Sequence, residues 1–186
     1  MFHLNRAGES PGTTELPGPV TVGEGTGLRW LPLALFMIVL DQLVKIWVVA
    51  DLKPFESHHI LPVLDFTLMF NTGAAWSFLS DASGWQRWAF IALASIVSVA
   101  LVIWLHRLRA RTQGLLACSL AFILGGAVGN LIDRVRIGHV VDFIYPHWND
   151  HWFPAFNVAD SSITIGAALL LIDAFLDSRN AKGSKA

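Results

Sequence analysis

Four long apolar stretches constrain the fold of this chain more than any other feature. They cover residues 30–49, 88–105, 114–132 and 156–176, and the second and third contain no charged side chain. Each is close to the roughly 20 residues that an α-helix needs to cross about 30 Å of hydrocarbon. Because unpaired backbone groups are not tolerated in lipid, helices are the natural form for such stretches. The sequence therefore predicts four membrane-spanning helices.

The composition supports a single integral membrane domain. Of the 186 residues, 54% are hydrophobic and 15% are charged, whereas a soluble domain usually has about 25% charged residues. Residues 1–28 are rich in Gly, Pro, Thr and Glu without an apolar period, so we expect a disordered cytoplasmic tail. Residues 29–178 are expected to form the membrane domain and residues 179–186 a cytoplasmic C-terminal tail. The net charge of −1 gives no basic field that would favour nucleic acid.

Basic side chains indicate how the spans are oriented. They lie before the first span, in the link 106–113 and after the fourth span: Arg6, Arg29, Arg107, Arg109, Arg111, Arg179, Lys182 and Lys185. The positive-inside rule then places both termini and this link in the cytoplasm. The longer connections, 50–87 and 133–155, lie outside, and the first has the residue pattern of one or two short strands. The predicted fold is an all-α integral membrane protein, a four-transmembrane-helix bundle with a small outer-side β platform.

Two charged residues occur inside the first span. Asp41 and Lys45 are four residues apart and lie on one helix face, where an ion pair is the least unfavourable way to keep two charges near a membrane boundary. The pair has two interpretations. It braces the bundle, or it orients a neighbouring site.

Polar residues also gather near the end of the third span. Gly125 and Gly129 form a face of small residues that allows another helix to approach. Asn130 and Arg134 follow with four-residue spacing, and Asp133 lies beside them. This set either caps and anchors the helix, or Arg134 holds a carboxylate or a peptide carbonyl in its guanidinium fork.

Two asparagines occur in short segments of small residues. In FNTGAAWS, the amide of Asn71 can donate to and accept from an extended peptide, and Gly73 lets a backbone come close. An ordinary turn is the alternative there. In FNVADSS, Asn157 is a candidate N-cap of the fourth span, which places Asp160 in the first helical turn.

A second aspartate is expected at the same depth as Asp160. Asp142 stands in the apolar run HVVDFIYPHW, midway along the outer connection that returns to the fourth span. A carboxylate there is unfavourable unless something compensates for its desolvation. Two neighbouring carboxylates share a proton, since they do not both ionise easily. One then takes a proton from water while the other donates to a peptide carbonyl, so the pair predicts an aspartic protease.

The histidines form no recognised metal motif. His58 and His59 are adjacent and His147 and His151 are four apart, but the sequence contains no HExxH. We expect solvated or interfacial histidines, no metal ion and no cofactor. The sequence also lacks a phosphate-binding glycine loop and a nucleophile elbow.

Five motifs, in order along residues 30–177, resemble those of the lipoprotein signal peptidases (signal peptidase II), bacterial inner-membrane aspartic proteases. Each motif alone is weak, and the five in order are specific. They are DQLVK at 41–45, FNTGAAWS at 70–77, GGAVGNLIDR at 125–134, VVDF at 140–143 and FNVADS at 156–161.

This resemblance implies roles for individual residues. Asp142 and Asp160 are the implied catalytic pair, and Gly73 is implied to let the substrate backbone approach. The residues implied to shape and support the site are Asp41, Lys45, Asn71, Asn130, Arg134 and Asn157.

The resemblance also implies a reaction. The implied substrate is a prolipoprotein whose lipobox cysteine carries diacylglycerol, and cleavage just before that cysteine releases the signal peptide. The site is implied to lie near the outer leaflet of the bacterial inner membrane, among membrane lipids, with cyclic peptide antibiotics as inhibitors. A small proton-coupled transporter and a scaffold subunit are the alternatives. Intramembrane acids also serve as proton relays, but the unusual residues here gather on one side of the membrane.

Overall fold

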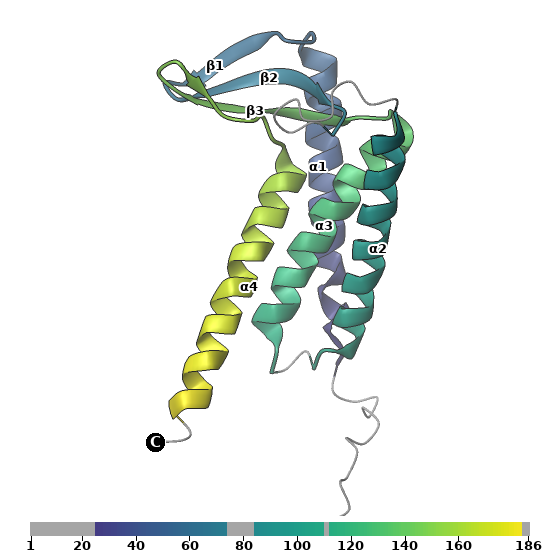
Figure 1. The fold of residues 1–186 in the computed structure, drawn as a ribbon, viewed down its shortest axis with the longest axis vertical. Coiled ribbons are helices and arrows are strands. Elements are labelled where there is room, and N and C mark those ends of the chain that lie inside the picture. Colours follow the sequence, from purple (N-terminus) through teal and green to yellow (C-terminus); the bar gives the residue numbers. More distant parts are fainter. Residues whose placement is uncertain (1–24, 74–83, 110–111, 184–186) are drawn as a thin grey trace, which may run out of the picture.

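The computed structural model describes residues 25–73, 84–109 and 112–183. Four long helices form a bundle, and a four-stranded antiparallel sheet, in the order β1-β2-β3-β4, lies across one end of it (Figure 1). The elements in chain order are the 3-10 turn η1 (Gly27–Trp30), α1 (Leu31–Asp51), β1 (Ser57–Leu61), β2 (Leu64–Asn71), α2 (Trp85–Arg107), α3 (Gly114–Arg136), β3 (Val140–Trp148), β4 (His151–Trp152) and α4 (Val158–Gly183). Most of the expected N-terminal tail and residues 74–77 lie outside the described residues.

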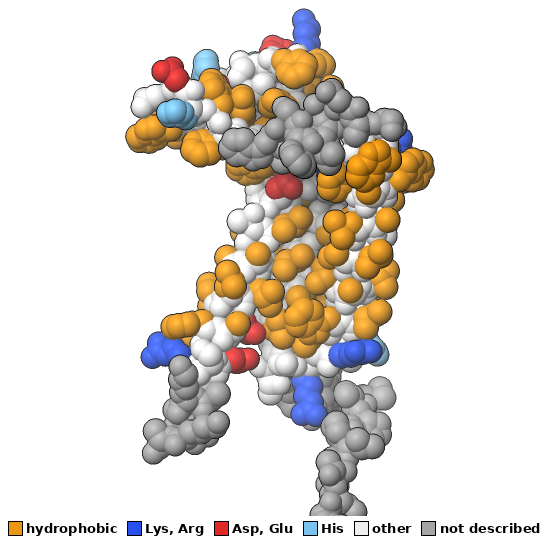
Figure 2. All heavy atoms as spheres, viewed as in Figure 1, with side chains coloured by type: hydrophobic (Ala, Val, Ile, Leu, Met, Phe, Trp, Pro, Cys, Tyr) orange, Lys and Arg blue, Asp and Glu red, His pale blue; other side chains and the backbone are white. Residues whose placement is uncertain are grey.

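The four helices have the length and composition of membrane spans. Large apolar side chains are exposed along them, among them Phe36, Ile96 and Leu171, and Figure 2 shows hydrophobic side chains covering the face of the bundle. Such a surface suits hydrocarbon rather than water. The predicted four-helix membrane fold with a small β platform is therefore confirmed. The helix α4 continues past residue 178, where the membrane domain was expected to end.

Small residues let the helices of the bundle pack closely around α3, which contacts the other three. A Cβ atom on Gly125 would lie 2.8 Å from Cβ of Met37 and 2.9 Å from the carbonyl oxygen of Ala34, both in α1. A Cβ atom on Gly129 would lie 2.8 Å from Oδ2 of Asp41. The predicted small face of α3 thus packs against α1.

The sheet brings the two outer connections together. The strands β1 and β2 form a hairpin, so the described part of the first connection contains two strands, where one or two were expected. Strand β2 pairs antiparallel with β3, and this register sets Met69 opposite Asp142 and Asn71 opposite Val140. The end of β2 therefore lies beside the aspartate that stood out in the sequence.

An apolar cluster attaches the sheet to the bundle. It joins the last turns of α1 to the faces of β2 and β3, and its buried members are Val48, Leu52, Leu68, Val141 and Phe143. Burial of such side chains contributes about 1.5–3 kcal/mol each. The sheet is thereby fixed relative to the helix ends that carry the polar residues.

The chain leaving the sheet is held to β3 before it enters α4. Backbone hydrogen bonds of 2.9 and 3.0 Å connect Ile144 and Phe156 in both directions. The residue after Phe156 is Asn157, which therefore lies next to β3. The start of α4 and the middle of β3 are adjacent as a result.

Candidate active site

Asp142 is buried in β3, with 2% of its surface exposed. The amide nitrogen Nδ2 of Asn71 donates to Oδ2 of Asp142 at 2.9 Å. The amide oxygen of Asn71 accepts the backbone N–H of Gly73 at 2.8 Å. The amide that was expected to serve an extended peptide is thus used to hold Asp142 and the turn after β2.

Gly73 meets two local requirements of the fold. Its φ of 106° lies in the left-handed region that favours glycine. A Cβ atom at this position would collide with the ring of Phe90 in α2. The turn therefore needs glycine for its own geometry, while a role in admitting a substrate backbone stays a prediction.

Asp160 lies in the first turn of α4, where Asn157 caps the helix as the sequence predicted. The side-chain oxygen of Asn157 accepts the backbone N–H of Asp160 at 2.9 Å, and Oδ2 of Asp160 accepts the backbone N–H of Asn157 at 3.2 Å. This reciprocal pairing is a capping box, which satisfies two N–H groups that a helix start leaves unpaired. It also fixes the direction of the Asp160 carboxyl group.

Asn157 connects the two aspartates. It is fully buried, and its Nδ2 donates to Oδ1 of Asp142 at 2.7 Å and to Oδ1 of Asn130 at 3.1 Å. Nδ2 of Asn130 in turn donates to Oδ1 of Asp160 at 2.8 Å. The structure thus brings Asp142 and Asp160 together at the sheet end of the bundle, joined by two amides.

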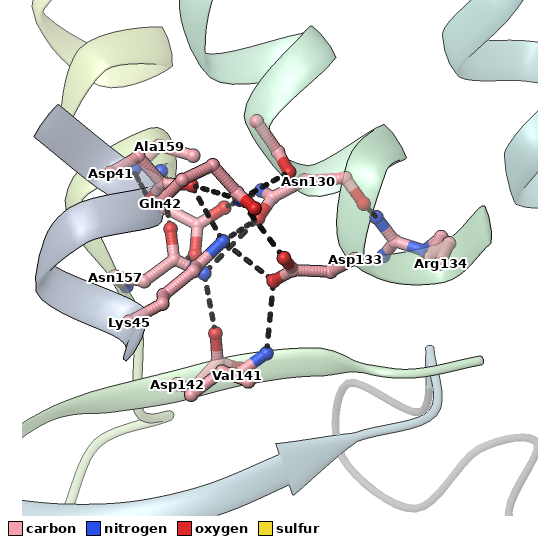
Figure 3. Close-up of polar contacts among 12 residues, drawn as sticks. Asp41, Gln42, Lys45, Asn130, Asp133, Arg134, Val141, Asp142, Asn157 and Ala159 are labelled. Atoms are coloured by element: carbon pink, nitrogen blue, oxygen red, sulfur yellow. Dashed lines mark hydrogen bonds and ion pairs between the residues drawn. The ribbon is translucent and has the colours of Figure 1, made fainter. Parts of the chain in front are cut away.

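The buried side chain of Lys45 lies beside these amides (Figure 3). The ammonium group of Lys45 is 2.9 Å from Oδ2 of Asp41 and 2.8 Å from Oδ2 of Asp133, and it donates to Oδ1 of Asn130 at 3.0 Å. Gln42 adds a hydrogen bond of 3.0 Å to Oδ1 of Asp133. The expected pair of Asp41 and Lys45 is therefore part of a larger network between α1 and α3.

The two acids of this network also bind backbone N–H groups. Oδ1 of Asp41 accepts the N–H of Ala159 at 2.9 Å, and Oδ2 of Asp133 accepts the N–H of Val141 at 3.2 Å. Each of these N–H groups belongs to the residue directly before one of the two site aspartates. The network therefore positions the backbone of both α4 and β3.

Arg134 lies one helical turn after Asn130 on α3. Its guanidinium donates to the carbonyl oxygen of Asn130 at 3.3 Å and lies 5.0 Å from the centre of the Phe90 ring. Among the described residues it makes no ion pair with a carboxylate. The backbone oxygen of Arg134 accepts Nε of Arg87 at 2.9 Å, which ties α2 to the end of α3.

Three contributors were not predicted from the sequence as members of the site. Gln42 stands next to Asp41 in the DQLVK motif, and this adjacency was the only available signal. Asp133 was noted beside Asn130, but its ion pair with Lys45 was not expected. Arg87 lies at the start of α2, outside all five motifs, and no sequence pattern indicated its contact with α3.

The environment of Asp142 favours its protonated form. Burial raises the pKa of Asp142 to about 6, and the charge of Asp160 adds to the increase. Hydrogen bonds from Asn71 and Asn157 and the charge of Lys45 act in the opposite direction and limit the shift. A carboxyl group that keeps its proton beside an ionised one can donate while its neighbour accepts.

Comparisons with known proteins identify the family of this chain. The model of the family "Signal peptidase (SPase) II" matches residues 33–176. A lipoprotein signal peptidase of Ectopseudomonas mendocina is 53% identical over 157 residues, which are 83% of this chain and 92% of that protein. One from Pseudomonas aeruginosa (strain UCBPP-PA14) is 49% identical over 159 residues, 84% of this chain and 94% of that protein.

Two solved structures are similar to this chain in fold. Two structures described as a bacterial membrane enzyme are each 34% identical to this chain. One has a TM-score of 0.71 and covers 82% of this chain and 90% of its own. The other has a TM-score of 0.68 and covers 77% of this chain and 90% of its own. With its four spans, its buried aspartate site and these relatives, the chain belongs to the signal peptidase II family of bacterial membrane peptidases.

Proposed function

We propose that this chain removes signal peptides from prolipoproteins by an aspartic mechanism, with Asp142 and Asp160 as the catalytic pair. The observation that carries the proposal is the position of buried Asn157, which donates to both carboxyl groups, at 2.7 Å to Oδ1 of Asp142 and at 3.2 Å to Oδ2 of Asp160. The printed name of the curated relatives, lipoprotein signal peptidase, supports the substrate class. The proposed scissile bond is the one just before a diacylglyceryl-modified lipobox cysteine.

In the proposed mechanism Asp142 begins protonated and Asp160 begins ionised. Asp160 takes a proton from a water molecule as the water oxygen attacks the peptide carbonyl carbon, and Asp142 gives its proton to the carbonyl oxygen. In the second step Asp142 recovers a proton from a hydroxyl of the tetrahedral intermediate. Asp160 gives its proton to the amine nitrogen as the C–N bond breaks, which restores the starting state of both groups.

The raised pKa of Asp142 supports this assignment of the shared proton. Asp160 accepts two N–H donors, from Asn130 and from the backbone of Asn157. Asp142 also accepts two N–H donors, so the number of donors does not distinguish the two groups. Asp160 differs in lying in the first turn of a helix, where the helix dipole favours a negative charge. The raised pKa of Asp142 therefore suits the acid of the mechanism, and the position of Asp160 at a helix start suits the base.

The supporting residues are proposed to act by position rather than by chemistry. Asn130 and Asn157 orient the carboxyl groups, and Lys45 with Asp41 holds the elements that carry them. Arg134 uses one N–H in its described contact, so its guanidinium has further donors for a carbonyl oxygen of the peptide substrate.

We also propose that the site faces the outer leaflet of the inner membrane, with both termini in the cytoplasm. Basic side chains gather at the end of the bundle opposite the sheet (Figure 2), which supports this orientation through the positive-inside rule. A lipid-anchored precursor is confined to the bilayer, so a site at the outer end of the bundle meets its scissile bond without extracting the acyl chains. Binding in this fixed position reduces the entropy lost on the way to the transition state.

The test is cleavage of a defined precursor by purified protein in detergent or lipid. A diacylglyceryl-modified prolipoprotein is mixed with the wild type and with the variants Asp142→Asn and Asp160→Asn. We expect the wild type to cleave just before the modified cysteine and each variant to lose at least about 1,000-fold in rate, since each removes a proton-transfer group and disturbs its partner. A cyclic peptide antibiotic of the type that the family resemblance implies is expected to stop cleavage by the wild type.

The matched control is Asp150→Asn, because Asp150 is an exposed aspartate near the end of the same connection. It should cleave at the wild-type rate. Cleavage that survives in Asp142→Asn or Asp160→Asn, with the fold intact by circular dichroism, contradicts the proposed pair. Cleavage of an unmodified precursor at the same rate contradicts the proposed substrate.

A further inference from the structure

A second cluster of titratable side chains lies on the sheet, apart from the aspartate pair. It contains His59 of β1, Asp65 of β2 and His147 of β3, so each of three adjacent strands contributes one residue. Nδ1 of His59 is 2.7 Å from Oδ1 of Asp65, and Nε2 of His147 is 3.3 Å from the same oxygen. Neither the adjacent pair 58/59 nor the pair 147/151 predicted this meeting of distant histidines.

The burial of the cluster is unusual for an ordinary surface contact. The side chain of Asp65 is 1% exposed and that of His147 is 16% exposed. Nε2 of His147 is itself buried, and among the described residues it has no hydrogen-bond partner, although it lies 3.3 Å from Oδ1 of Asp65. A buried ring nitrogen without a partner is unfavourable unless another group occupies the space between it and its neighbours.

Surrounding contacts fix the orientation of these side chains. The hydroxyl of Ser57 donates to Oδ2 of Asp65 at 3.1 Å and is 2.7 Å from the hydroxyl of Thr67. The ring of His147 packs against Trp152, with 4.5 Å between ring centres. Outer groups that hold a carboxylate and an imidazole in place are a regular feature of metal sites.

We propose that His59, Asp65 and His147 form a Zn²⁺ site that joins β1, β2 and β3. Two imidazole nitrogens and one carboxylate oxygen are ligands that Zn²⁺ takes in tetrahedral sites, with water in the fourth position. The three ligand atoms lie within 4.8 Å of one another, and a tetrahedral zinc ion with bonds of about 2.0–2.2 Å separates its ligand atoms by about 3.3 Å.

The protonation states that coordination needs are accessible in this cluster. The hydroxyl of Ser57 contacts Oδ2 of Asp65, which leaves Oδ1, the oxygen nearest to both imidazole nitrogens, available to the metal. His59 must carry its proton on Nε2 and His147 on Nδ1, so that Nδ1 and Nε2 respectively face the metal. The side chain of His59 is 79% exposed, which gives the ion a route from solvent.

The site acts on the structure of the sheet, not on the peptide bond. A bound ion links the β1–β2 hairpin to β3 through side chains, in addition to the backbone register that already pairs these strands. Because a ligand that binds only the folded state stabilises it, zinc is expected to raise the unfolding temperature. None of the three ligands makes a described hydrogen bond with Asp142 or Asp160.

The experiment is a zinc titration of the full chain in detergent after removal of any affinity tag and of bound metal. Isothermal calorimetry, or competition with a chromophoric chelator, is expected to give one zinc ion per chain. Thermal unfolding with and without zinc is expected to give a higher midpoint with zinc. The assay reads binding and stability, so its outcome does not depend on the proposed peptidase mechanism.

Variants identify the ligands. Ser57→Ala removes an outer contact to Asp65 and is expected to weaken zinc binding roughly 10–100-fold. The ligand variants His59→Gln, Asp65→Asn and His147→Gln are expected to weaken zinc binding more than Ser57→Ala does. His58→Gln and His151→Gln are the controls and should bind like the wild type. His59 is mostly exposed, so His59→Gln keeps the test valid if the buried variants fail to fold. Absence of stoichiometric zinc binding, or equal losses in the controls, overturns the proposal.

Discussion

At the scale of single residues, the arrangement of Asn157 explains how two carboxyl groups are held differently. Its side-chain nitrogen donates to Asp142, while its side-chain oxygen accepts the backbone N–H of Asp160, so the amide cannot rotate without losing both contacts. A second donation, to Asn130, uses the remaining amide hydrogen. One fully bonded side chain therefore sets the direction of both acids, which is the kind of preorganisation that catalysis requires.

The pH dependence of the reaction belongs to this scale. The pKa of Asp142 is raised to about 6, mainly by burial, so the group loses its proton as the pH rises through this value. Because the proposed acid must be protonated, kcat/KM is expected to fall on the alkaline side, with an apparent pKa that belongs to the pair. The hydrogen bond from Asn71 favours the ionised form of Asp142. Asn71→Ala should therefore move the alkaline limb to higher pH while it lowers the maximum rate.

The measurement is a pH series of initial cleavage rates for the wild type, Asn71→Ala and the control Asn180→Ala. Asn180 is exposed at the far end of α4, so its profile should match that of the wild type. A limb that stays in place or moves to lower pH in Asn71→Ala would show that Asp142 does not supply the proton.

How much of the site could be predicted depends on where each residue's partners come from. Asp142 and Asp160 were identifiable because a carboxylate in an apolar run, or in the first turn of a span, is conspicuous by itself. Gln42 was not, because its role depends on Asp133, 91 residues away in sequence. Arg87 was missed for the same reason, since its partner is a backbone carbonyl on another helix.

At the scale of elements, the polar network fastens four segments to one another. Lys45 on α1 pairs with acids on α1 and α3, and those acids bind the backbone of α4 and β3 through Ala159 and Val141. Asp41 and Lys45 connect two helices and also contact the residue before Asp160, so these contacts agree with both interpretations of the pair, and the choice between them stays a prediction. Buried charges of this kind persist only when every partner is present.

Removing the ammonium group of Lys45 should therefore weaken the contacts that connect α1, α3, α4 and β3. Lys45→Met leaves the carboxylates of Asp41 and Asp133 buried without their shared positive charge, and loss of one member of a buried ion pair costs about 3–5 kcal/mol. We expect a clearly lower unfolding temperature in detergent and a smaller effect on turnover, measured below that temperature. The exposed Lys53→Met is the control. Unchanged stability with lost turnover would assign Lys45 a direct role in the reaction.

The packing of α1 on α3 gives a prediction that involves no charge. A side chain at Gly125 would meet Met37 and the backbone of Ala34, whereas a Cβ atom on Gly114, at the start of α3, has no neighbour within 4 Å. Gly125→Leu is expected to destabilise the bundle by about 1–3 kcal/mol through overpacking. Gly114→Ala should leave the unfolding temperature in detergent unchanged. Equal effects in the two variants would mean that the contact with α1 is not needed for stability.

At the scale of the whole molecule, the two ends of the bundle differ in chemistry. The sheet end carries the aspartates and exposed indole rings, namely Trp47, Trp85, Trp88, Trp148 and Trp152. The opposite end carries basic groups and the start of α1 (Figures 1 and 2). The four spans were predictable because length and apolarity suffice to define them. The short strand β4 and the pairing of β2 with β3 were not, since strand pairing depends on contacts that no local pattern records.

This asymmetry predicts a single orientation, which cysteine labelling can test. In a Cys118→Ser background, Asp150→Cys introduces a thiol in the connection beside the sheet and Ser178→Cys introduces one near the opposite end of α4; both positions are exposed. With a membrane-impermeant maleimide applied to intact spheroplasts, we expect labelling at position 150 at once and at position 178 only after the membrane is opened. Basic residues near the ends of short loops remain on the cytoplasmic side, so we expect the sheet and the aspartates to face outward. The reverse pattern would place the proposed catalytic pair at the cytoplasmic leaflet and would contradict the proposed orientation.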